Sequence, residues 1–147
     1  MGTLADFMNQ LTDAQGRTPD QALVNAMCLS VAADGEVTNE ELEQALGMAM
    51  DLPGLKGKPQ GEVEKYVERA FQQLKADGME RCMVNVAKTL ATPEEREHAF
   101  TLAAAVQYID GGISEQENEF LAAFRDYLDI DPDRADAILA DIEKHLK

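Results

Sequence analysis

Apolar residues recur at helical spacing along most of the chain, and short polar or Gly/Pro-containing stretches separate the periodic segments. Residues 63–74 and 135–146 each carry one apolar stripe, as expected of a helix that buries a single face. Residues 22–33 and 99–109 are apolar nearly all round, which predicts two buried central helices surrounded by amphipathic ones. We therefore predict an all-α fold, with helices at about 3–14, 19–33, 39–50, 62–76, 79–91, 93–109, 115–128 and 132–146.

Helix start signals occur in matching pairs. Residues 18–21 (Thr-Pro-Asp-Gln) and 92–95 (Thr-Pro-Glu-Glu) each place a threonine N-cap before a proline, with a Gln or Glu three residues after the cap. Capping boxes of the same kind are predicted at 38–41 and 114–117, where a Thr or Ser precedes a Glu by three positions. The two halves of the chain therefore carry matching helix-start signals, both at the first helix of each half and at the helix that follows its Asp-Gly phrase.

The same eight-residue phrase occurs twice, at Asp34–Glu41 (DGEVTNEE) and at Asp110–Glu117 (DGGISEQE). Each copy follows an apolar helical run and precedes an acidic amphipathic helix. We predict one domain, residues 1–147, made of about seven to eight helices in two pseudo-symmetric helix–Asp-Gly–helix halves. The pseudo-repeats span about 18–76 and 92–147.

The repeated phrase matches only the second half of an EF-hand calcium loop. The first and third loop positions, which need oxygen ligands, hold Ser30 and Ala32 in one copy and Val106 and Tyr108 in the other. All four belong to predicted helices, so a calcium ion would find too few oxygens there. This pattern argues against a calcium buffer of the EF-hand type.

Two interpretations of the phrase remain open. In the structural one, the aspartates accept turn hydrogen bonds, the glycines take strained dihedral angles, and the last glutamates cap the helices that follow. In the functional one, carboxylates beside helix C-termini meet partial negative charge, which a cation would relieve. If the central helices pack together, the two turns frame one acidic face. Asp34, Glu41, Asp110 and Glu117 would then suit a divalent cation such as Ca²⁺, Mg²⁺ or Mn²⁺.

Charge and cysteine content restrict the partners and the compartment. The net charge of −15 argues against nucleic acid and anionic lipid headgroups, and favours cations or basic protein surfaces. Cys28 and Cys82 lie in apolar helical patterns, which predicts buried free thiols in a reducing compartment. The first nine residues lack a basic signal-peptide segment, and the charge-free stretches 21–33 and 99–109 are too short to span a bilayer. We therefore expect a cytoplasmic protein without membrane insertion.

No catalytic constellation can be assembled from the sequence. His98 stands beside the charged residues 94–97 at a helix start, where we expect it on the surface, and neither it nor His145 has a Cys or His partner at zinc spacing. The chain contains neither a P-loop nor a GxGxxG phrase. We predict a protein that is not an enzyme.

The Asp-Gly phrases and the apolar helices before them, in residues 30–41 and 106–117, are followed in the second half by Leu-Asp-Ile-Asp-Pro at 128–132. In these features the chain resembles the TerB-like family of tellurite resistance proteins, over roughly residues 18–146. The resemblance implies a duplicated all-helical fold and a small cytoplasmic stress-response module, without known catalysis, that assembles with other proteins, including membrane-associated complexes.

The resemblance also implies metal binding through an acidic cluster. By position, that cluster falls on Asp34, Glu41, Asp110 and Glu117, while Gly112 departs from the more acidic second turn of family members. Two functions follow as hypotheses. One is a divalent-cation binding module in metal or tellurite stress, and the alternative is an acidic protein–protein interaction adapter that needs no metal.

Overall fold

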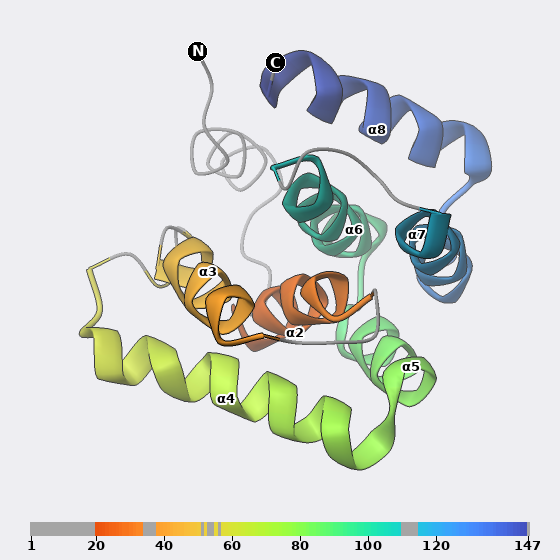
Figure 1. The fold of residues 1–147 in the computed structure, drawn as a ribbon. Helices are drawn as coiled ribbons and strands as arrows, with labels where there is room; N and C mark the ends of the chain where they lie inside the picture. The colour runs from red at the N-terminus through yellow and green to blue at the C-terminus, as the bar shows by residue number, and fades with distance from the viewer. Residues whose placement is uncertain are drawn as a thin grey trace.

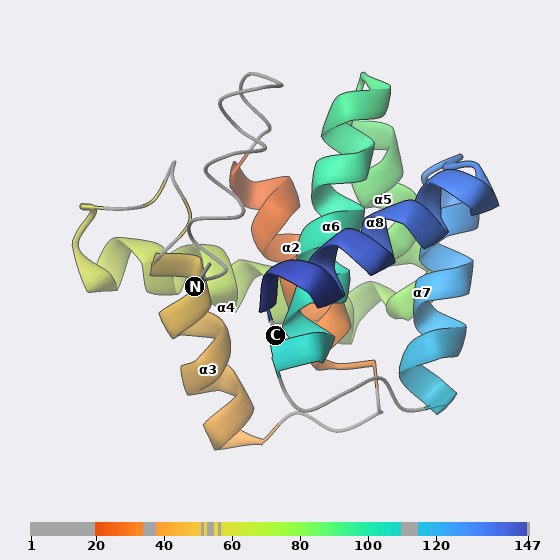
Figure 2. The same ribbon diagram turned by 90° about the horizontal axis from the view of Figure 1, so that it is seen from above.

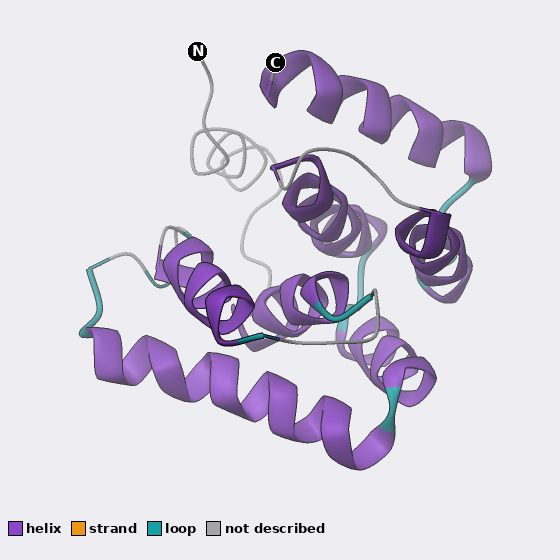
Figure 3. Ribbon diagram, in the orientation of Figure 1, coloured by secondary structure: helices purple, strands orange, loops and turns teal. Residues whose placement is uncertain are grey.

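The computed structural model describes residues 20–33, 38–50, 52, 55, 57–109 and 115–146, which form helices, turns and loops and contain no strand (Figures 1 and 3). The predicted helix at 3–14 lies outside the described residues. The described helices are α2 (Asp20–Val31), α3 (Asn39–Met50), α4 (Gln60–Asp77), α5 (Met79–Thr89), α6 (Pro93–Ile109), α7 (Glu115–Tyr127) and α8 (Pro132–Leu146). The all-α prediction is confirmed.

Helices α2 and α6 form the centre of the molecule, as predicted, and pack on each other more extensively than any other described pair. Small side chains allow this close approach, because Ala103, Ala104 and Ala105 follow one another in α6 and are fully buried. The Ser30 hydroxyl of α2 donates a hydrogen bond to the Ala103 carbonyl of α6 at 2.6 Å. This bond ties the C-terminal end of α2 to the middle of α6.

The remaining described helices cover this central pair. Helices α3, α4 and α5 pack on α2, whereas α7 and α8 pack on α6, and α5 also contacts α7 (Figure 1). Each outer helix buries one apolar stripe, for example Val63, Val67 and Ala70 in α4. Each central helix thus contacts the two or three helices that follow it in the chain. The internal duplication itself stays a prediction.

Helix ends follow the capping signals of the sequence. The Thr38 N–H donates to Glu41 Oε1 at 3.0 Å, and the Glu41 N–H donates to Thr38 Oγ1 at 3.1 Å, which confirms a capping box. Thr92 and Glu95 make the same reciprocal pair at 3.1 and 3.2 Å. Between α4 and α5, Gly78 turns the chain with φ of 89°, a conformation that favours glycine.

No helix in the described part of the chain is both long enough and apolar enough to cross a lipid bilayer.

Candidate functional site

The C-terminal ends of α2 and α6 lie at the same end of the bundle as the N-terminal ends of α3 and α7 (Figure 2). These four ends flank the two Asp-Gly phrases in the sequence, and we call this part of the molecule the turn end. The connecting segments 34–37 and 110–114 lie outside the described residues. The prediction of a joint acidic face required the two central helices to pack together. Helices α2 and α6 do pack closely on each other.

The four predicted ligand residues are described to different extents. Glu41 lies partly buried in the first turn of α3, and its Oε1 accepts the Thr38 N–H of the capping box. Glu117 belongs to the first turn of α7, but its side chain lies outside the described residues, as do Asp34 and Asp110 entirely. A carboxylate has two oxygens, so the cap of Glu41 leaves acceptor capacity on that group. The metal assignment therefore stays a prediction.

The electrostatics of the turn end favour positive charge. Neither α2 nor α6 has a basic residue in its last turn, so no Lys or Arg of these helices offsets the partial negative charge at their C-termini. The first turn of α3 adds the carboxylates of Glu40 and Glu41. Among the described residues alone, no group of three His, Cys, Asp or Glu side chains is arranged to hold a metal ion. Of the four predicted ligands, Asp34 and Asp110 lie outside the described residues.

Sequence reasoning missed Gln107, a polar side chain buried near the turn end. Gln107 is 0% exposed, and neither its amide nitrogen nor its amide oxygen has a hydrogen-bond partner in the structure as described. It lies one helical turn after Ala103, on the face of α6 that meets α2, and three residues before Asp110. The sequence feature that could have identified Gln107 as a buried polar residue is that it is a single amide side chain within the apolar run 99–109.

The predicted surface position of His98 is wrong. Its side chain is 1% exposed, whereas its charged neighbours in the sequence led us to expect it on the surface. The charges of the first turn of α6 face outward, and His98 begins the buried part of the helix. Burial lowers the pKa of His98 to about 4, because a charged imidazolium would lose its hydration. The imidazole is therefore neutral at neutral pH.

The two cysteines behave as predicted, since both are buried and free. Burial raises the pKa of Cys28 and that of Cys82, and the carboxylate of Asp77 raises the latter further. Thiols with raised pKa values are poor nucleophiles and poor metal ligands at neutral pH. Neither cysteine is therefore a candidate for catalysis.

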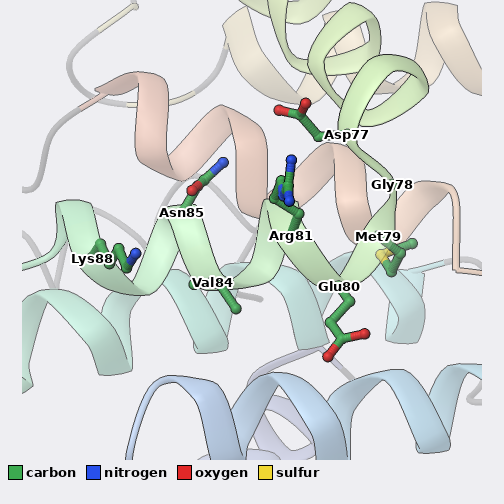
Figure 4. A pocket seen from close by; sticks show the side chains of 8 residues that line it. All are labelled: Asp77, Gly78, Met79, Glu80, Arg81, Val84, Asn85 and Lys88. Atoms are coloured by element: carbon green, nitrogen blue, oxygen red, sulfur yellow. The ribbon is translucent and has the colours of Figure 1, made fainter.

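A wide groove of about 600 Å³ lies where α4 meets α5, and its lining residues are Asp77, Gly78, Met79, Glu80, Arg81, Val84, Asn85 and Lys88 (Figure 4). Its charges are mixed, and no serine, cysteine or histidine lines it. Glu80 is already engaged, because the Tyr127 hydroxyl of α7 donates to its Oε1 at 2.6 Å. That hydrogen bond raises the pKa of Tyr127. The groove has no nucleophile–base pair of the kind that hydrolases use.

Comparison with protein-family models matches residues 6–140 to the family described as tellurite resistance protein TerB. Searches of curated proteins and of solved structures gave no match.

Proposed function

Since the chain belongs to the tellurite resistance protein TerB family, we propose that it is a non-enzymatic binding module that holds a divalent cation at the turn end. The ligands would be Asp34, Glu41, Asp110 and Glu117, and the setting would be the response to metal or tellurite stress in the cytoplasm. The observation that carries the proposal is that the four helix ends flanking the Asp-Gly phrases lie at the same end of the bundle (Figure 2).

The chemistry of the turn end supports this assignment. Carboxylate and carbonyl oxygens are the ligands that Ca²⁺, Mg²⁺ and Mn²⁺ prefer. The C-terminal carbonyls of α2 and α6 add partial negative charge, and no basic side chain in their last turns competes with a cation. The Gln107 amide offers one more oxygen at the same end of α6.

A second candidate function is an acidic adapter that binds a basic protein surface without metal. The net charge of −15 favours this alternative, because it attracts cationic partners over long range. Such partners would include proteins of a membrane-associated complex, with this chain itself outside the bilayer.

Thermal unfolding of metal-stripped protein separates the two functions. Ca²⁺, Mg²⁺, Mn²⁺ and Zn²⁺ are added singly at fixed ionic strength. A ligand at 100 times its Kd adds about 2.7 kcal/mol, or roughly 5–10 °C in Tm for a chain of this size. We expect one cation to raise Tm, and Asp34→Asn or Asp110→Asn to abolish the rise.

Asp136→Asn, on the exposed face of α8, is the matched control and should leave the response intact. An equal, salt-like response to all four cations, or a rise that survives both turn variants, would reject the metal site and leave the adapter function.

A further inference from the structure

An apolar groove of about 380 Å³ lies between α3 and α4, and its lining on α3 begins at Leu42, the residue after Glu41. Its floor is formed by Leu42 and Leu46 of α3 and by Val67 and Phe71 of α4. Leu42 is 37% exposed, more than any other large apolar side chain among the described residues. A single exposed apolar side chain is ordinary on a protein surface, but Leu42 is continuous with the apolar lining of this groove, and contiguous apolar surface is what marks interaction sites.

The rim of this groove is acidic. Glu43 of α3 and Glu64 and Glu68 of α4 line it, together with Gln72, and no Lys or Arg does. None of these three glutamates forms an ion pair with any described residue. Glu64 accepts only a long hydrogen bond, 3.4 Å, from the Gln60 amide. The negative charge on the rim is therefore available to a partner.

Helix α4 carries three basic residues, Lys65, Arg69 and Lys75, and none of them lines the groove or forms an ion pair with its glutamates among the described residues. Arg69 donates to the Gln21 side chain of α2 at 3.2 Å, on a different side of the helix from Phe71. Lys75 follows Phe71 by one turn on the groove side, beyond the lining residues. The negative charge that α4 contributes to the rim is thus carried by the carboxylates of Glu64 and Glu68, in the first half of the helix.

We propose that this groove binds an amphipathic helix of a partner protein, with its apolar side chains between α3 and α4 and its Lys or Arg side chains against Glu43, Glu64 and Glu68. Two neighbouring helices leave a groove that a third helix fills by ridges-into-grooves packing, with anchors at i, i+3, i+4 and i+7. The negative charge of the rim and of the whole chain favours a basic partner helix over a second copy of this chain. A second copy of this chain has the same net charge of −15 and would be repelled, whereas a basic helix is attracted.

None of the described residues that line this groove is a proposed cation ligand, and the peptide test is run without metal, so the two proposals can fail separately. The test uses the full chain, labelled with ¹⁵N and kept in a chelator. The probe is a synthetic helical peptide of about 18 residues, long enough to form a helix, with leucines on one face and lysines flanking them. Peptides with glutamate in place of lysine, or with the leucines scrambled, are the comparison probes.

We expect the basic peptide to shift the amide signals of α3 and α4 around Leu42 and Phe71, and to bind at least tenfold more tightly than either comparison peptide. Leu42→Ser should weaken binding tenfold or more, and it should fold, because Leu42 is exposed. Glu64→Gln with Glu68→Gln should weaken binding several-fold and reduce its dependence on salt. Glu119→Gln, on the exposed side of α7, is the control and should leave Kd unchanged.

Three results would overturn the proposal. The first is an absence of shifts in α3 and α4, or shifts confined to other helices. The second is equal binding of the basic and acidic peptides. The third is a dimer in sedimentation equilibrium that Leu42→Ser dissociates, which would assign the groove to a second copy of the chain.

Discussion

Replacement of Gln107 by Met tests whether the buried amide of α6 is unsatisfied in the molecule. Gln107 is 0% exposed, and both polar atoms of its amide lack a hydrogen-bond partner among the described residues. A buried polar group without a partner costs about 1–3 kcal/mol. Methionine has a similar length and no such groups, and a swap that conserves volume costs below about 1.5 kcal/mol. We therefore expect Gln107→Met to stabilise the metal-free protein by about 1–2 kcal/mol.

The assay is urea unfolding of metal-free wild type and variant, with Tm as a second measure. A gain of this size raises Tm by roughly 2–8 °C for a chain of this length. Gln72→Met, which replaces an exposed amide on α4, is the control and should stay within about 0.5 kcal/mol of wild type. A metal-free Gln107→Met that is less stable than wild type would refute the reasoning, because the amide would then have partners in solution. If Gln107 also contributes an oxygen to the proposed cation, the variant gains stability in the apo state and shows a smaller metal-induced rise.

Two further predictions concern the central helix pair. His98 has a pKa of about 4 in the folded chain and about 6.5 when unfolded, so only the unfolded chain binds its proton between these values. Stability should therefore fall as pH falls through this window, by about 3 kcal/mol in wild type relative to His98→Gln. Parallel curves of unfolding free energy against pH for the two proteins would contradict this. Ser30→Ala removes the hydroxyl that donates to the Ala103 carbonyl at 2.6 Å, and should cost about 0.5–1.5 kcal/mol in urea unfolding. No loss would show that this bond does not help to hold α2 against α6.

Most helices could be predicted because their signals are local. Apolar periodicity and the capping boxes located α3, α6 and α8 to within a residue at each end. Helix α4 begins at Gln60, two residues before the prediction. The low helix propensity of Gly61 argued for a later start, but the Pro59 carbonyl accepts hydrogen bonds from the Glu62 and Val63 N–H groups and so starts the helix earlier. The start of α2 at Asp20 and the end of α5 at Thr89 also differ by one or two residues, as helix ends commonly do.

The sequence by itself determined the helical class, the two buried central helices and the acidic net charge, and it predicted the four carboxylates of the candidate site. These features follow from residue type and spacing, which act within a few turns of chain. Only the tertiary structure decided that the ends of α2, α3, α6 and α7 flanking the Asp-Gly phrases lie at the same end of the bundle, that His98 and Gln107 are buried, and that α3 and α4 leave an acidic-rimmed groove. Each of these depends on which helix faces which, and that is set by packing between segments distant in the chain.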